Sequence, residues 1–144
     1  MFWKPFSETE ERQIRDAIEK AEVTFSGEIR VHVDRYCKSN PFLVARNTFN
    51  KLEMGKTMLQ NGVLIYVALD DHKFAIIGDS GINDKVPDGF WDGIRDDMSS
   101  QLAAGKVVEA IETGIERSAE ELKKHFPPME DDENELPDDI SYGS

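Results

Sequence analysis

Residues 63–69, VLIYVAL, are the most informative stretch for the fold because every side chain in them is apolar or aromatic. A strand has this composition when other layers cover both faces of its sheet. The turn Asp70-Asp71-His72 follows, and a second apolar run at residues 74–77, FAII, comes too soon for a helical crossover. Strands joined by so short a turn pair antiparallel. The sequence therefore predicts a buried central strand and an antiparallel neighbour.

The chain before this hairpin alternates between helical and strand patterns. Ser7-Glu8-Thr9-Glu10 fits a capping box, and apolar residues then recur at helical spacing to about residue 24. Residues 28–34 alternate polar and apolar side chains, as a half-buried strand does. Asn40-Pro41 is typical of a helix start, and that helix ends near Gly55.

Two more helical patterns follow the hairpin, at residues 90–98 and 107–122. The resulting order is helix, strand, helix, two strands and two helices. Because the central strand must be covered on both faces, this order predicts an α/β fold, a three-layer α/β/α sandwich around a small mixed sheet.

The net charge limits the classes of partner. The chain has 144 residues, with 29 acidic side chains against 17 basic ones and a formal charge of -12. A length of this order favours one domain. A surface of this sign repels the phosphates of nucleic acids and anionic lipids, so we expect neither nucleic acid nor bare membrane as a partner.

Much of the negative charge lies in the last stretch, residues 127–144. It begins with Pro127-Pro128 and carries seven acidic side chains and no Lys or Arg. A segment this polar cannot bury enough apolar surface to fold alone. We therefore expect a folded domain over residues 1–126 and an acidic, disordered tail over residues 127–144.

The sequence predicts a cytoplasmic protein. Its N-terminus lacks the apolar core of a signal peptide, and no stretch approaches the roughly 20 apolar residues of a membrane span. Its lone cysteine, Cys37, cannot form an internal disulfide, which agrees with a reducing compartment. We expect a monomer, with a protein partner that the sequence does not identify.

A loop rich in aspartate predicts a divalent metal site. Six aspartates lie between residues 79 and 97, in a stretch that glycines interrupt. Hard cations bind carboxylate and backbone oxygens in such loops, so we expect a divalent cation here. If the strands at 28–34 and 63–69 are parallel, Glu28 lies at the same end of the sheet as Asp79. The candidate ligands are Glu28, Asp79, Asp84, Asp88 and Asp92.

The spacing of these aspartates allows a second interpretation. Asp84, Asp88, Asp92 and Asp96 recur every four residues, so within a helix they would share one face and repel by roughly 0.2–0.5 kcal/mol per adjacent pair. A bound cation would offset this repulsion. In the alternative, Asp88 caps the helix at 90–98 and Asp92 lies in its first turn, where carboxylates interact favourably with the helix dipole.

A second, weaker candidate cluster lies at the opposite end of the sheet. It consists of Asp34, Asp70 and Asp71, but aspartate-rich turns usually serve only as turns. Other signatures fail. Gly55-Lys56-Thr57 lacks the first glycine of a phosphate-binding loop, and the three histidines are too scattered for a zinc site.

Four segments give the chain a family resemblance. They are SGEIRV at 26–31, NGVLIYV at 61–67, DDHK at 70–73 and GDSGIN at 78–83. With these segments in this order, residues 7–125 resemble the TPM domain family. The resemblance implies an α/β/α sandwich with a four-stranded sheet, of which the pattern supplies three strands. It also implies an acidic loop that holds calcium-like cations, matched here by Asp79, Asp84 and Asp88, so calcium is the expected metal and magnesium the second choice.

Three functions remain open at this point. The first is a metal-responsive interaction or regulatory module. The second is a metal-assisted acid phosphatase, because a plant member of the family is associated with that activity. For that role the loop offers only Arg95 or Lys85 to neutralise a phosphate. The third is a scaffold for protein partners with the tail as a docking element. Whether the protein is an enzyme stays undecided.

Overall fold

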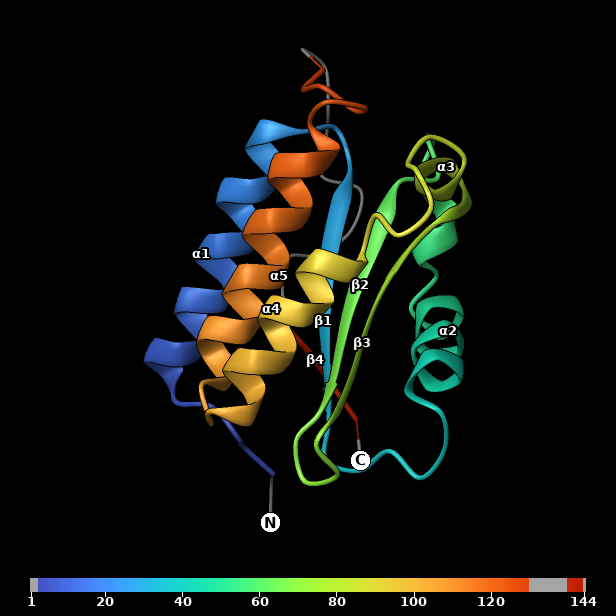
Figure 1. Ribbon diagram of the computed structural model, residues 1–144. Helices are drawn as coiled ribbons and strands as arrows, with labels where there is room; N and C mark the ends of the chain where they lie inside the picture. Colours follow the sequence, from blue (N-terminus) through green and yellow to red (C-terminus); the bar gives the residue numbers. More distant parts are fainter. Residues whose placement is uncertain (1–2, 130–139, 144) are drawn as a thin grey trace.

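A four-stranded mixed sheet lies between two helical layers in the computed structural model, which describes residues 3–129 and 140–143 (Figure 1). β1 (Glu28–Asp34) pairs in parallel with β2 (Gly62–Ala68), and β3 (Lys73–Gly78) pairs antiparallel with β2. β4 (Ser141–Tyr142) pairs in parallel with the other edge of β1, so the strand order is β3-β2-β1-β4. The predicted α/β/α sandwich around a mixed sheet is confirmed.

The thicker layer consists of α1 (Glu8–Thr24), α4 (Asp92–Ala103) and α5 (Val107–Leu122), which cover one face of the sheet (Figure 1). The opposite face carries α2 (Pro41–Lys51) and the short 3-10 helix η1 (Met54–Lys56). Each layer packs its own apolar core against the sheet.

β2 contributes to both cores, which explains its uninterrupted apolar sequence. Val63, Ile65 and Val67 belong to the larger core. Leu64, Tyr66 and Ala68 belong to the smaller core, beneath Ala45 and Phe49 of α2. Because successive side chains of a strand point to opposite faces, a strand between two layers has no position for a solvated side chain.

The predicted helix starts are present. The Ser7 hydroxyl accepts a hydrogen bond from Glu10 N at 3.1 Å, and Glu10 Oε1 accepts one from Ser7 N at 2.9 Å, which completes a capping box. At α2, Asn40 Oδ1 accepts a hydrogen bond from Phe42 N at 2.8 Å, with Pro41 at the first helical position. One short helix was not predicted, α3 (Ser80–Asn83).

The C-terminal segment differs from its prediction. Residues 130–139 lie outside the described residues, but the expectation of a disordered tail is wrong for residues 140–143. Ile140 is only 8% exposed and joins the larger core, and Ser141 and Tyr142 pair with His32 and Val33 of β1. The free edge of β1 supplies backbone hydrogen-bonding groups that a short uncharged segment can satisfy, whatever the charge of the preceding residues.

None of the helices in the described part of the chain is both long enough and apolar enough to cross a bilayer.

The double role of β2 predicts a large stability cost for shortening its side chains. Ile65 is fully buried, so Ile65→Ala should lower the free energy of unfolding by about 2–5 kcal/mol through lost transfer energy and a residual cavity. Urea unfolding measures the change. Val23, which is 75% exposed, gives the matched control, and Val23→Ala should change stability by less than about 0.5 kcal/mol. Equal effects of the two substitutions would contradict this description of the core.

Candidate functional site

Asp79 is placed by the end of β3 and the start of α3. Its backbone N donates a hydrogen bond to Gly62 O at 2.9 Å, which fixes the residue at the end of the sheet. Its Oδ1 accepts a hydrogen bond from Ser80 N at 2.7 Å and caps α3. Its other oxygen, Oδ2, is buried and accepts no hydrogen bond from the described residues. A buried carboxylate oxygen without a donor is rare, because leaving it unsatisfied costs free energy.

Glu28 lies at the same end of the sheet. It begins β1, is only 4% exposed, and stands opposite Gly62 in the parallel register. Since Gly62 O also accepts the hydrogen bond from Asp79 N, the parallel pairing brings Glu28 and Asp79 to one end of the sheet, as the sequence predicted.

Asp84, Asp88 and Asp92 are exposed and occupy three different settings. Asp84 follows the last residue of α3, Asp88 lies in the turn before α4, and Asp92 is the first residue of α4, with its Oδ1 3.2 Å from Arg95 Nη1. Residues 84–91 are not helical, so Asp84 and Asp88 do not share a helical face with Asp92. Trp91, and not Asp88, occupies the cap position of α4.

The five predicted ligands therefore approach one end of the sheet without forming a compact group. Within residues 3–129 and 140–143, no set of three or more His, Cys, Asp or Glu side chains is placed to hold a metal ion. Among the described residues, the buried Oδ2 of Asp79 accepts no hydrogen bond.

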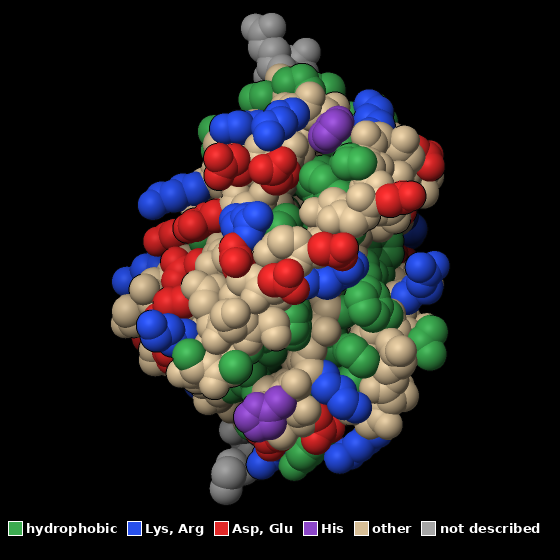
Figure 2. All heavy atoms as spheres, viewed as in Figure 1, with side chains coloured by type: hydrophobic (Ala, Val, Ile, Leu, Met, Phe, Trp, Pro, Cys, Tyr) green, Lys and Arg blue, Asp and Glu red, His purple; other side chains and the backbone are tan. Residues whose placement is uncertain are grey.

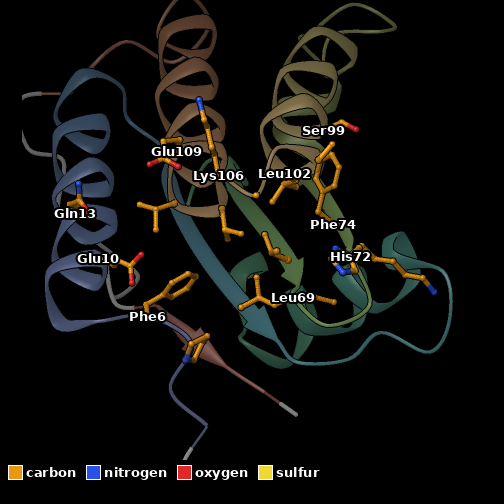
Figure 3. Close-up of a pocket in the computed structure, with 18 residues that line it drawn as sticks. Phe6, Glu10, Gln13, Leu69, His72, Phe74, Ser99, Leu102, Lys106 and Glu109 are labelled. Carbon is orange, nitrogen blue, oxygen red and sulfur yellow. The ribbon is translucent and has the colours of Figure 1, made fainter.

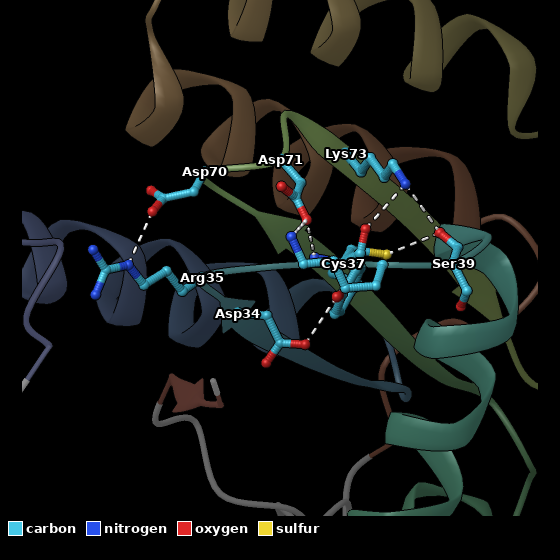
Figure 4. Close-up of polar contacts among 9 residues, drawn as sticks. Asp34, Arg35, Cys37, Ser39, Asp70, Asp71 and Lys73 are labelled. Carbon is cyan, nitrogen blue, oxygen red and sulfur yellow. Dashed lines mark hydrogen bonds and ion pairs between the residues drawn. The ribbon is translucent and has the colours of Figure 1, made fainter.

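The second acidic cluster is satisfied by separate donors (Figure 4). Arg35 Nε donates to Asp70 Oδ2 at 2.9 Å, and this hydrogen bond raises the pKa of the Arg35 guanidinium. Cys37 N donates to Asp71 Oδ2 at 2.7 Å, which ties the chain after β1 to the β2–β3 turn. Lys73 Nζ strengthens the same connection by donating to Cys37 O at 3.0 Å. These carboxylates act as turn and loop anchors.

Asp34 belongs to a buried polar network that sequence analysis did not predict. Tyr66 OH donates to Asp34 Oδ2 at 2.8 Å, and His32 Nε2 lies 2.8 Å from Asp34 Oδ1. Burial, and then the hydrogen bond to Asp34, raises the pKa of the Tyr66 phenol. The His32 and Tyr66 rings stack with their centroids 6.0 Å apart. The alternation of residues 28–34 already places His32 and Asp34 on one face. Tyr66 lies within an apolar run, which gives no signal that its hydroxyl makes a buried hydrogen bond.

The network continues to β4, because His32 Nδ1 lies 2.7 Å from Ser141 Oγ. A carboxylate only accepts hydrogen bonds, so His32 Nε2 is the donor to Asp34, and in the neutral imidazole Nδ1 then accepts from the Ser141 hydroxyl. Serine, histidine and aspartate in this order resemble a hydrolase relay. Here, however, the aspartate also accepts from Tyr66 and the serine is fixed in a β-ladder, so we interpret the network as an anchor for β4.

A cleft of about 800 Å³ lies near the β2–β3 turn, at the opposite end of the sheet from Asp79 (Figure 3). Its walls come from the residues before α1 and from α1, β2, β3, α4 and α5, and their apolar side chains include Phe6, Leu69, Phe74, Leu102 and Val107. Charged side chains of both signs stand among them, so the cleft has no single charge preference. None of the predicted metal ligands lines it.

The outer surface separates charged from apolar regions. Figure 2 shows acidic and basic side chains interspersed on the side of α4 and α5, with apolar side chains towards α2. Large apolar side chains exposed near α2 are Phe42, Leu43, Met58 and Leu59. The Arg95 guanidinium lies over the Phe42 ring at 5.0 Å.

Together, the mixed sheet, the unequal helical layers and the acidic segment after β3 define a class of small α/β/α domains with an acidic loop at one end of the sheet. The chain belongs to the TPM domain family, whose family model matches residues 4–121. None of the curated proteins compared with the chain matches it.

Two solved structures are similar to the chain. The NMR structure of BA42 protein from the psychrophilic bacterium Bizionia argentinensis has a TM-score of 0.92 and 44% sequence identity, and covers 99% of each chain. The N-terminal domain of a protein from P. gingivalis has a TM-score of 0.66 and 16% identity, and covers 84% of this chain and 78% of that one. The second likeness supports the fold alone.

The buried network predicts the effect of removing one hydroxyl. Tyr66→Phe keeps the ring but leaves Asp34 Oδ2 without its donor, so the free energy of unfolding should fall by about 1–3 kcal/mol. Urea unfolding at neutral pH measures the loss. Tyr36→Phe is the matched control, because Tyr36 is 42% exposed, and should have little effect. A loss no larger than that of the control would show that the Tyr66 hydroxyl does not stabilise the fold.

Proposed function

We propose that this domain is a metal-responsive interaction module that binds a divalent cation, calcium or magnesium, at the loop that begins with Asp79. The observation that carries the proposal is the buried Oδ2 of Asp79, which accepts no hydrogen bond from the described residues. A cation satisfies such an oxygen and removes the cost of its burial.

The surroundings of Asp79 supply further oxygen ligands of the kind that hard cations prefer. Glu28 lies at the same end of the sheet, and Asp84, Asp88 and Asp92 are exposed nearby in the chain. A divalent cation would also reduce the repulsion among these carboxylates. Because the described residues hold no ready group of three ligands, binding would have to reposition part of the loop between α3 and α4.

Two sets of contacts link the acidic loop to the exposed apolar side chains. The first runs through Gln60. Gly81 N donates to Gln60 O at 2.9 Å, and the Ser80 hydroxyl donates to Gln60 Oε1 at 2.7 Å. A Cβ on Gly81 would lie 2.2 Å from Leu59 O, so α3 and this segment are in close backbone contact. A movement of α3 would therefore move Leu59 and its neighbour Met58, which is 82% exposed.

The second set runs through Arg95. Its Nη1 lies 3.2 Å from Asp92 Oδ1, and its guanidinium covers the Phe42 ring. A cation on Asp92 would compete with Arg95 and so change the exposure of Phe42. Through both sets of contacts, cation binding would alter an apolar surface, which is the kind of surface that protein partners recognise.

The alternative, a metal-assisted acid phosphatase, finds less support. Such an enzyme needs cationic side chains that face the substrate phosphate. The nearest candidates are engaged elsewhere: Arg95 contacts Asp92 and Phe42, and Lys85 Nζ lies over the Phe126 ring at 4.7 Å. We therefore favour an interaction module over a phosphoesterase.

Calorimetric titration of chelator-treated protein with calcium, and then with magnesium, tests the proposal. Micromolar binding is expected for the full chain, with a loss of at least tenfold in affinity for Asp79→Asn. Asparagine keeps Oδ1 as an acceptor for Ser80 N, so the cap of α3 should survive the substitution. At a cation concentration of 100 times Kd, binding should stabilise the fold by about 2.7 kcal/mol.

Asp70→Asn provides the matched control, because Asp70 is exposed and belongs to the cluster at the other end of the sheet. This variant should bind like the unaltered chain. Absence of binding to the folded protein would contradict the proposal, and so would equal losses in the two variants, which would indicate diffuse attraction to a negative surface.

A further inference from the structure

Four consecutive residues at the C-terminal end of the described chain each make a different contact with the domain. Ile140 is buried in the larger core, and Ser141 contacts His32. Tyr142 OH donates to Glu11 Oε2 at 2.8 Å, and Gly143 N donates to Val33 O at 3.0 Å. The segment is held as a peptide ligand is held, by backbone pairing to a strand edge and by a separate contact for each successive side chain.

The contacts of Ser141 and Gly143 are selective. Asp34 orients His32, whose Nδ1 is then free to accept a hydrogen bond from a hydroxyl at the Ser141 position. A Cβ at position 143 would lie 2.1 Å from Asp34 Oδ1 and 3.0 Å from His32 Nε2. Both contacts are made to a buried, hydrogen-bonded pair, so the pair cannot easily give way. The site therefore admits serine or threonine followed two residues later by glycine.

The Tyr142 contacts add an aromatic preference. Its ring meets Trp3 edge to face, with the centroids 6.4 Å apart, and its hydroxyl reaches Glu11 of α1. Burial, and then this hydrogen bond, raises the pKa of the Tyr142 phenol. The walls of the site, at Glu11, His32 and Asp34, lie within the region that matches the family, residues 4–121, whereas the bound segment lies beyond it.

We propose that the β1 edge is a recognition site for an extended peptide of another protein, and that residues 140–143 occupy it within the same chain. The peptide adds parallel to β1 and carries an aliphatic residue, a serine or threonine, a tyrosine and a glycine in that order. Only two residues of β4 pair with β1, so the segment is held by few backbone bonds and can be exchanged.

The bound segment competes with a peptide in solution because it is attached to the domain. Such attachment gives an effective concentration on the order of millimolar, so a free peptide binds only when the segment is displaced. Gly143→Val in the full chain displaces it through the contact with Asp34 and leaves the walls of the site intact. Gly55→Val is the matched control, since a Cβ on Gly55 meets nothing within 4 Å.

The experiment measures the fluorescence anisotropy of a labelled peptide with the sequence of residues 139–144, DISYGS. It should bind the Gly143→Val chain at least tenfold more tightly than the unaltered chain or the Gly55→Val chain. The same peptide with valine in place of glycine should not bind, and His32→Ala in the Gly143→Val chain should abolish binding.

Other outcomes overturn the proposal. These are equal binding to all chains, no binding to any of them, or binding that does not need His32. Urea unfolding of the Gly143→Val chain checks that the domain remains folded. Tyr142→Ala, which removes the contacts with Trp3 and Glu11, gives a second way to displace the segment, and it should also increase peptide binding.

Discussion

The burial of β2 on both faces is the constraint on which the rest of the structure depends. Val63, Ile65 and Val67 pack under one helical layer, while Leu64, Tyr66 and Ala68 pack under the other. A strand that can expose no side chain lies in the interior of the sheet, and here β1 and β3 flank it. The sheet can present polar groups only at its two ends and along its edges. Each feature considered as a functional site lies at one of these places.

The two ends differ in how their carboxylates are satisfied. At the end near the β2–β3 turn, Asp34, Asp70 and Asp71 each have a donor from the protein, and together they fix the turn and the loop after β1. At the other end, Asp79 has one oxygen that caps α3 and a second that is buried without a donor. A protein tolerates a buried oxygen without a donor most readily where a ligand binds that oxygen. This contrast is why the proposed cation site is placed at the Asp79 loop.

Much of the fold could be predicted from local patterns, because burial and helix capping require particular residue types at particular spacings. The capping box at Ser7 and the apolar run of β2 predicted their elements, and parallel pairing predicted that Glu28 and Asp79 lie at the same end of the sheet. The four-residue spacing of Asp84, Asp88 and Asp92 was misleading, since Pro87 and Gly89 interrupt the helix that would have aligned them. β4 was missed because two residues carry no periodicity, and the role of Tyr66 depends on a partner 32 positions away in the chain.

NMR spectra of the backbone amides during a calcium titration measure whether the Asp79 loop and the apolar surface are coupled. If they are coupled, saturable shifts at Ser80 and Gly81 extend to Gln60 and Leu59, because hydrogen bonds join these segments. The amides of His32 and Cys37, at the other end of the sheet, should not change. Shifts spread evenly over exposed acidic residues, or centred on Asp70 and Asp71, would contradict this coupling.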